Sequence, residues 1–596
     1  MHHKEITNIF LNYFIDRDHH LLPNQSLIPS ESDSSGLFIN SGMHTIKPYF
    51  YGIEKPQKSK LCSIQKCLRT IDIDNVGYNR RTLTLFSMLG SWSINDYWKE
   101  DAIPLAYELL VDSFGFDPNK LSVTYFEGDD KVPEDLETKA EWEKVGVPEE
   151  RIIKLDGKNN FWSAGPTGLC GPCTEIYFDR GEEYGCGEET CKPSCDCDRY
   201  LEIWNAGVFI QYDRQKDGSL KTLQLISVDT GAGLERIATI LQGKDSVYDT
   251  TIFKPIVSNI ISSCSIEKED LSSENKYVRI IADHLRASTF LLAENIIPSN
   301  IDRGYVLRRL LRRSINHASS LGIEKDGLVG VVDKIILNEG EEHTYLQENK
   351  DIILLNFARE YDGFIKTLNK GKKKLMQAIE GLFQGSELES QIAFNLFDTY
   401  GFPFELTEEI CKQKGIIVNQ NTFKDLLQEH KAKSRAGFQK KFSSGLMTSS
   451  YICVKYHTAT HLLHQALRDV LGEEVEQKGS NVTPERLRFD FSFQRPLTPE
   501  EISNVEEIVN QKIKSNLKIT KKVTSLEEAI ASGAIALFQD KYDKKINVYS
   551  IGDYSKEVCK GPHIQETSEL GNFKIIKEKS SSSGIRRIRA VLKEEF

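Results

Sequence analysis

Two short motifs that lie far apart in the sequence carry the same kind of metal-binding side chain. In HTATHLLH, His457 and His461 are four positions apart, so on a helix both imidazoles project from one face. In CKGPH, Cys559 and His563 flank a turn with glycine and proline and add a thiolate and an imidazole. Zinc prefers four such ligands in a tetrahedron. We therefore predict a zinc site that joins the two segments; the alternative is that the helical histidines only cap or pack.

A second group of candidate metal ligands lies in the stretch GCGEETCKPSCDC. Disulfides are rare in the cytosol, and a chain of 596 residues can bury a large core without them. Four thiols within twelve residues can surround one zinc ion, and the glycine and proline residues between them favour turns. The alternative is an exposed, reactive loop without metal. The four residues are Cys186, Cys191, Cys195 and Cys197.

Charge and hydropathy exclude several classes of protein. No apolar run reaches the roughly 18 residues of a membrane helix, and the first twenty residues are charged where a signal peptide is apolar. We therefore expect a cytoplasmic protein without a membrane segment. The 76 Lys and Arg against 87 Asp and Glu give a net charge of -11, so a nucleic-acid partner needs a local basic face.

The stretch RGYVLRRLLRR provides a basic face of this kind. On a helix its arginines cover an arc of about 140°. A solvated helix face is the alternative interpretation, and composition does not decide between the two. The arginines are Arg308, Arg309, Arg312 and Arg313.

Changes of pattern along the chain predict a multidomain α+β protein. Residues 1–240 mix strand-like apolar runs with Gly and Pro, which indicates a mostly antiparallel sheet with helices. Helical periodicity dominates residues 241–440, and the basic, Ser-rich segment 441–451 has the character of a linker. Residues 452–596 read as a second α+β domain, which begins with the histidine-bearing helix.

A nucleotide site is less visible, because the chain has no P-loop and no dinucleotide-binding fingerprint. Arg69 follows a likely strand, and Arg236 closes DTGAGLERIA. Such arginines can neutralise phosphates, and Asp229 beside them can hold an ammonium group. Each signal is weak alone, since a buried arginine more often forms an internal salt bridge.

The longer motifs resemble those of the alanyl-tRNA synthetase family, class II aminoacyl-tRNA synthetases with a built-in editing domain. The resemblance covers nearly the whole chain. The stretches that carry it include GLFINSGMHTIKPYF, QKCLRTIDIDNVG, NFWSAGPTGLCGPCTEIYFD, RYLEIWN, VDTGAGLERIA, ADHLRASTFLLAENIIPSN, FDTYGFPFELT, HTATHLLHQALRDVLG and QKGSNVTPERLRFDF.

The resemblance implies a class II antiparallel sheet that activates alanine with ATP and magnesium. Arg69 and Arg236 then bind ATP phosphates, and Asp229 binds the ammonium group of alanine. Other residues of the alanine and adenylate pocket are carried over in the same way. They are Met88, Trp162, Asn205, Gly231 and Gly233.

The resemblance also implies how RNA is read and how errors are removed. Asn300 and Asp398 match the pair that reads a G·U wobble in the acceptor stem of tRNA(Ala), with the arginines of RGYVLRRLLRR on the backbone. An alanine pocket rejects glycine or serine by only about 1–3 kcal/mol. A zinc-dependent editing domain, with Gln477 near the metal, hydrolyses seryl- and glycyl-tRNA(Ala).

The chain is shorter than most of the family. The β-rich insert usual before HTATHLL and the C-terminal domain are missing, so we expect a monomer. Two rival interpretations stay open. One is a tRNA-binding or regulatory paralogue that has lost activation, and the other is a hydrolase that only edits.

Overall fold

The computed structural model describes residues 1–30, 36–165, 167–265, 271–400, 402–429, 451–483, 485–535, 546–559, 561–582 and 584–593. It divides into two compact units, Met1–Asp362 and Gly363–Phe596. The division falls within the long helix α12 (Lys350–Ile379). The domain limits expected from the sequence stay predictions, and residues 441–450 of the expected linker lie outside the described residues.

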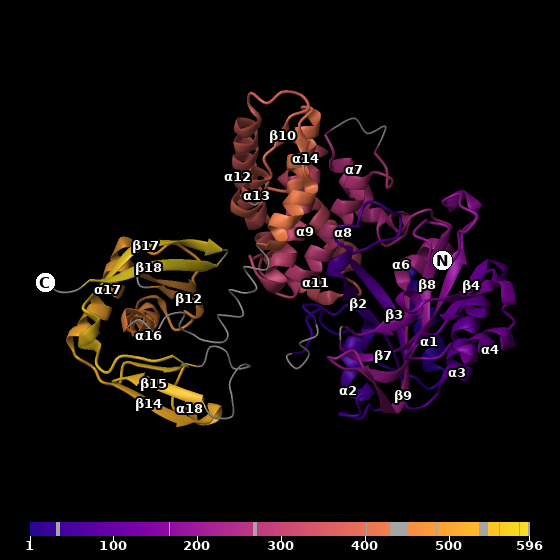
Figure 1. Ribbon diagram of the computed structural model, residues 1–596, viewed down its shortest axis with the longest axis horizontal. Coiled ribbons are helices and arrows are strands. Elements are labelled where there is room, and N and C mark those ends of the chain that lie inside the picture. Colours follow the sequence, from indigo (N-terminus) through magenta and orange to yellow (C-terminus); the bar gives the residue numbers. More distant parts are fainter. Residues whose placement is uncertain are drawn as a thin grey trace. The chain divides into compact units, whose positions relative to one another are not determined.

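The first unit is built on a nine-stranded, mostly antiparallel sheet (Figure 1). The order is β1-β2-β3-β9-β8-β7-β4-β5, with β6 beside β7, and only the β1–β2 and β4–β5 pairs are parallel. This confirms the expected α+β fold class with its mostly antiparallel sheet. The strands are β1 (His20–Leu21), β2 (Lys60–Leu68), β3 (Leu85–Ile94), β4 (Leu121–Phe126), β5 (Ile152–Leu155), β6 (Phe161–Ser163), β7 (Gly168–Asp179), β8 (Tyr200–Arg214) and β9 (Leu220–Gly233).

Helices pack on this sheet and continue beyond it. Those that precede β9 are α1 (His3–Ile15), α2 (Lys47–Phe50), α3 (Lys99–Glu108), α4 (Leu136–Lys144) and α5 (Gly157–Asn160). After β9 the unit is helical, with α6 (Leu234–Leu241), α7 (Lys254–Ser263), α8 (Lys276–Ala293), α9 (Asp302–Ser320), α10 (Lys325–Glu339), α11 (Thr344–Glu348) and the start of α12. Helix α8 is buried along nearly its whole length.

The second unit begins with helices and ends with two sheets around α16 (Tyr451–Leu471). Its first elements are β10 (Glu387–Leu388), α13 (Ser390–Tyr400), α14 (Phe404–Gln413) and β11 (Ile417–Val418). One sheet has the order β12-β13-β18-β17 and the other the order β14-β15-β16. The remaining elements are β12 (Gln477–Thr483), β13 (Arg486–Ser492), α17 (Pro499–Lys514), β14 (Ile519–Thr524), α18 (Leu526–Ala531), β15 (Ile546–Ile551), β16 (Ser555–Val558), β17 (Asn572–Ser582) and β18 (Ile585–Lys593).

Local sequence explains the helices that enclose this second core. Helix α17 starts with a capping box, in which the Thr498 hydroxyl accepts from the Glu501 amide at 3.1 Å and the Glu501 carboxylate accepts from the Thr498 amide at 2.7 Å. Apolar side chains at helical spacing on α16, Leu463 and Leu467 among them, pack against Phe489 of β13 in one core cluster. In the described part of the chain, no helix is long and apolar enough to cross a membrane.

Candidate functional site

The antiparallel register brings Arg69 and Arg236 into one charged cluster. Arg69 directly follows β2, and Arg236 lies in the first turn of α6, directly after β9. Both arginines act electrostatically on the carboxylates of Glu175 and Glu202. Arg236 Nη1 donates to the carboxylate and to the carbonyl oxygen of Glu202, each at 2.8 Å. Arg69 Nε donates to the carbonyl of Asn40 at 3.3 Å, and its terminal nitrogens bond to none of the described residues.

The two carboxylates near these arginines have pKa values shifted in opposite directions: that of Glu175 is raised and that of Glu202 is lowered. Burial, and then repulsion by Glu202, raise the pKa of Glu175 to about 8. The Tyr177 hydroxyl donates to Glu175 Oε2 at 2.6 Å. Burial is the largest single influence on Glu202 and would raise its pKa. The combined attraction of Arg236, which also donates a hydrogen bond, and of Arg69 and Arg81 lowers that pKa instead. The pair can therefore receive a cation together with an anionic ligand of the arginines.

Asp229 on β9 is a buried carboxylate with a single neutral partner. Its Oδ1 accepts a hydrogen bond of 2.6 Å from Trp92 Nε1, which lies opposite it in the β3–β9 register. No Lys, Arg or His of the described residues forms an ion pair with it. Burial raises the pKa of Asp229 to about 7. A ligand with an ammonium group would supply the missing positive charge.

Most of the residues expected around the substrate lie on the neighbouring strands β3, β8 and β9, and Trp162 lies on β6. Asn205 and Gly231 are register partners in β8 and β9, and the buried Asn205 Oδ1 accepts no hydrogen bond from the described residues. A Cβ at Gly231 would lie 2.8 Å from Met88 Sδ, so any larger residue there would displace the Met88 side chain. Trp162 packs against the core cluster that contains Trp92. Gly233, the register partner of Met88, leads directly into the helix of Arg236.

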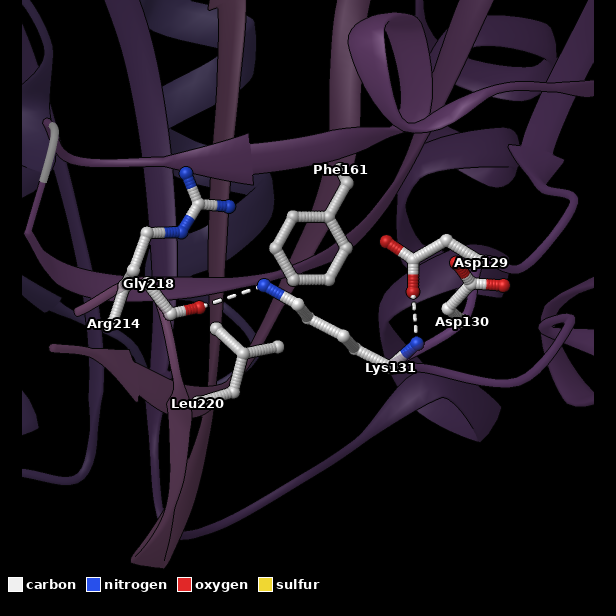
Figure 2. A pocket seen from close by; sticks show the side chains of 7 residues that line it. All are labelled: Asp129, Asp130, Lys131, Phe161, Arg214, Gly218 and Leu220. Atoms are coloured by element: carbon white, nitrogen blue, oxygen red, sulfur yellow. Dashed lines mark hydrogen bonds between the residues drawn. The ribbon is translucent and has the colours of Figure 1, made fainter.

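A cavity of about 390 Å³ lies apart from these residues (Figure 2). Lys131 bonds across it to the carbonyl of Gly218 at 2.8 Å, and the Arg214 guanidinium lies 5.6 Å from the centre of the Phe161 ring. None of the residues expected to bind substrate lines the cavity. The full lining is Asp129, Asp130, Lys131, Phe161, Arg214, Gly218 and Leu220.

In the second unit, the two predicted metal motifs come together. Candidate ligand atoms of His457, His461, Cys559 and His563 all lie within 4.8 Å of one another. His457 Nε2 lies 3.1 Å from the sulfur of Cys559. Burial lowers the pKa of all three histidines, that of His563 to about 2, so at neutral pH the imidazoles keep their lone pairs for a metal.

Neighbouring oxygens orient two of these three rings for metal binding. His457 Nδ1 lies 3.2 Å from the carbonyl oxygen of Pro562, and His563 Nδ1 lies 3.1 Å from Thr458 Oγ1. Metal-bound histidines use their second nitrogen in this way. His461 Nδ1 has no hydrogen-bond partner among the described residues, because the nearest carboxylate, that of Glu557, lies 3.8 Å away and pairs with His464 Nδ1 at 2.9 Å. The buried Nε2 of His563 has no hydrogen-bond partner among the described residues, so the donor set fits zinc. The predicted editing residue Gln477 begins β12, where its side-chain amide donates to Ser480 at 3.1 Å.

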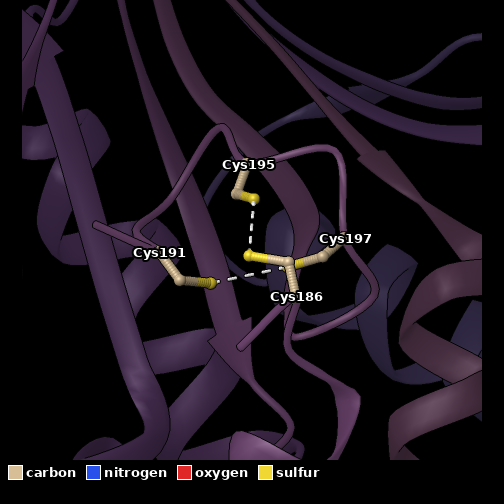
Figure 3. Close-up of side chains that lie close together, drawn as sticks. All are labelled: Cys186, Cys191, Cys195 and Cys197. Carbon is tan, nitrogen blue, oxygen red and sulfur yellow. Dashed lines mark hydrogen bonds between the residues drawn. The ribbon is translucent and has the colours of Figure 1, made fainter. Parts of the chain in front are cut away.

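The four predicted cysteine ligands also meet, in the loop between β7 and β8 (Figure 3). Ligand atoms of Cys186, Cys191, Cys195 and Cys197 lie within 4.8 Å of one another, with sulfur pairs at 3.8 and 3.5 Å. Four thiols with no disulfide fit a tetrahedral zinc. Arg81, in the segment before β3, donates to the carbonyl of Cys197 at 2.6 Å and so ties the loop to that segment.

The basic helix face is α9, and carboxylates from distant segments partly neutralise it. Arg309 and Arg313 lie 2.5 and 3.6 Å from Asp74, in the segment after Arg69. Arg308 and Arg312 lie 3.5 and 2.8 Å from Glu360 of α12.

Of the two residues expected to read the wobble pair, the structure describes the side chain of one only. Asn300 lies two residues before α9, and Arg308 donates to its Oδ1. Its contact with RNA stays a prediction. Asp398 lies in α13, but its side chain lies outside the described residues.

Comparisons with known proteins identify the chain. Residues 5–478 match the family described as tRNA synthetases class II (A). Residues 546–589, which include Cys559 and His563, match the threonyl and alanyl tRNA synthetase second additional domain. The chain therefore belongs to the class II tRNA synthetases.

Within that class, the chain belongs with the alanine–tRNA ligases. It is 45% identical to the alanine–tRNA ligase of Treponema pallidum over 99% of this chain and 98% of that ligase. The ligase of Borrelia hermsii is 44% identical over 99% of each chain. The ligase of Alkaliphilus oremlandii is 36% identical over 98% of this chain and 79% of its own length. That alignment has 702 positions, more than the 596 residues here, so the Alkaliphilus ligase contains internal segments that this chain lacks.

Proposed function

We propose that this chain attaches alanine to tRNA(Ala), through an alanyl-adenylate made from alanine and ATP. The observation that carries the proposal is the buried carboxylate of Asp229, which has no cation partner among the described residues and lies on the strand that ends beside Arg236. Alanine-dependent exchange of pyrophosphate into ATP tests it. We expect exchange with alanine and weaker exchange with serine and glycine; no exchange with alanine would contradict the proposal.

The charged cluster supports this chemistry. A carboxylate oxygen of alanine attacks the α-phosphorus, and pyrophosphate leaves with the electrons of the broken P–O bond. Arg69 and Arg236 stabilise the negative charge on the phosphoryl oxygens, because fixed guanidinium groups need no reorganisation. Glu175 and Glu202 are the carboxylates we assign to hold magnesium, which would neutralise further phosphate charge. Asn205 Oδ1 accepts from the substrate ammonium beside Asp229.

Alanine binding should weaken as the pH falls below about 7. Burial raises the pKa of Asp229 to about 7, so below that pH the carboxyl gains a proton and loses its attraction for ammonium. The ionised fraction falls about tenfold between pH 8 and pH 6, and KM for alanine should rise by a similar factor. The variant Asp229→Asn, which lacks the titrating carboxyl, is the control, and its alanine KM should change less over this range. An alanine KM that stays constant over this range would place the ammonium elsewhere.

We assign tRNA recognition to α9 and to Asn300, which lies two residues before it. The amide NH₂ of Asn300 can donate to an acceptor in the minor groove of the acceptor stem, and Asp398 is the proposed acceptor for the guanine amino group. Phosphates would compete with Asp74 and Glu360 for the arginines of α9. That the chain works as a monomer, and in the cytoplasm, stays a prediction.

We further propose that the second unit hydrolyses seryl- and glycyl-tRNA(Ala), since binding alone separates these amino acids from alanine too weakly. His457, His461, Cys559 and His563 would hold zinc, which can polarise the ester carbonyl or a water. Thr458 and the carbonyl of Pro562 would keep the imidazoles of His563 and His457 in the tautomer that leaves Nε2 for the metal.

The four-cysteine loop should bind a second zinc ion with a structural role, because all four ligand positions are filled by protein. The variant C186S/C195S is expected to bind one zinc equivalent fewer than the wild type and to melt at lower temperature. Deacylation of seryl-tRNA(Ala) should stay within about twofold of the wild type. Metal analysis of both proteins checks this, and an unchanged zinc content would remove the site.

A further inference from the structure

One face of the sheet β12-β13-β18-β17 carries an excess of positive charge that no zinc site uses. The other face packs against α16 and α17, where Phe489 of β13 and Ile588 of β18 belong to the buried core. Figure 1 shows α16 on one side of this sheet. Because side chains alternate along a strand, their neighbours point to the opposite side, called here the outer face.

The outer face brings cations together in the register of the sheet. Lys577, Arg589 and Arg488 stand side by side on β17, β18 and β13. Like charges that face each other on neighbouring strands destabilise a sheet. In the next row, Lys579 and Arg587 stand beside Asp490. At the described positions of these two rows, Asp490 is the single carboxylate.

Asp490 alone cannot neutralise the five cations of these two rows or accept all of their hydrogen bonds. It accepts two hydrogen bonds from Arg587, at 2.6 and 2.7 Å, and lies 3.8 Å from Arg488. Three buried guanidinium nitrogens have no hydrogen-bond partner among the described residues: Arg486 Nη1, Arg488 Nε and Arg589 Nε. An unsatisfied buried donor costs about 1–3 kcal/mol, more when it is charged. The outer face therefore lacks an anionic acceptor.

We propose that the outer face binds the sugar-phosphate backbone of the tRNA whose ester the second unit hydrolyses. The inference rests on the proposed function, because that function makes tRNA the substrate. Phosphate oxygens match the fork geometry of guanidinium groups. The chain as a whole has a net charge of -11, so a polyanion needs a local face of this kind. The four zinc ligands lie on α16 and in the CKGPH turn, so none of them belongs to the outer face or is used by backbone binding there.

The variant R488Q/R589Q in the full chain tests this assignment. Two lost phosphate contacts should reduce the slope of log affinity against log salt for tRNA(Ala) by about 2. KM for deacylation of seryl-tRNA(Ala) should rise roughly tenfold or more, with kcat and alanine activation unchanged. Thermal stability should not fall, because the substitutions relieve repulsion. The control K514Q/K522Q removes the same charge from exposed positions of α17 and β14 and should behave as the wild type.

Three results would overturn the assignment. The first is a salt slope and KM equal to those of the wild type, and the second is the same change in the control. The third is binding to phosphatidylglycerol vesicles that R488Q/R589Q loses while tRNA affinity stays constant, because the face would then serve a membrane. If the double variant does not fold, R589Q alone is measured. A wild type that neither alanylates nor deacylates would instead refute the proposed function.

Discussion

Asp229→Asn is expected to reduce kcat/KM for alanine activation by roughly 150-fold or more. Asparagine keeps the oxygen that accepts from Trp92 Nε1, so the local structure should persist. It removes the one charge available to the substrate ammonium in a buried site, and losing the partner of a buried charge costs about 3 kcal/mol or more. Alanine-dependent ATP–pyrophosphate exchange measures the effect.

Asp213→Asn is the matched control, because Asp213 is also a strand aspartate of the same sheet, on β8. It accepts hydrogen bonds from Gln215 and Tyr51. Exchange by this variant should stay within about twofold of the wild type. If Asp229→Asn kept wild-type kcat/KM, or if both variants lost activity equally, the assignment of the ammonium site would be wrong.

The double substitution His457→Ala and Cys559→Ala is expected to abolish editing while leaving activation intact. Two ligands do not hold zinc tightly, so one zinc equivalent should be lost and deacylation of seryl-tRNA(Ala) should fall by roughly a hundredfold or more. Alanine activation should stay within about twofold, because its residues belong to the first unit. Metal analysis, deacylation and exchange are measured on the same preparation.

Cys453→Ala is the control for this second prediction. Cys453 is a buried cysteine of the same helix, α16, and is not among the four grouped ligands. The variant should keep its zinc and its deacylase activity. Unchanged metal content in the double variant would show that His457 and Cys559 do not form a zinc site.

Part of the predicted site rests on local spacing, while the joining of HTATHLLH with CKGPH rests on the chemistry of zinc ligands. His457 and His461 share a face of α16 because helical periodicity dictates it, and the four cysteines meet because twelve residues form a single loop. Long specific motifs also predicted the family and the class II sheet, both of which are confirmed.

The electrostatic partners were not predictable, because they come from strand register between distant segments. Trp92 lies opposite Asp229 in the sheet, yet nothing near Trp92 in the sequence indicates that it holds a carboxylate. Glu175 and Glu202 read as ordinary strand residues until the sheet places them beside Arg236. Such pairings depend on tertiary contacts that hydropathy patterns do not encode.

For the basic helix α9, the sequence alone overestimated the positive charge, because it does not show which distant carboxylates pair with the arginines. Composition predicted a strongly positive stretch on α9. The fold adds Asp74 and Glu360 to that face, so its net charge is lower than the sequence indicates. The outer face of the second unit was missed for the related reason that Arg488 and Arg589 become neighbours only in the sheet.

Alanylation of an acceptor-stem minihelix tests the central claim most directly. The purified chain is incubated with ATP, magnesium and labelled alanine, and with a minihelix that carries either the G·U wobble pair or a G·C pair. The account predicts an alkali-labile alanyl ester on the wobble-bearing RNA and little on the other. Absence of alanyl ester on both RNAs, with a folded and zinc-loaded protein, would contradict it.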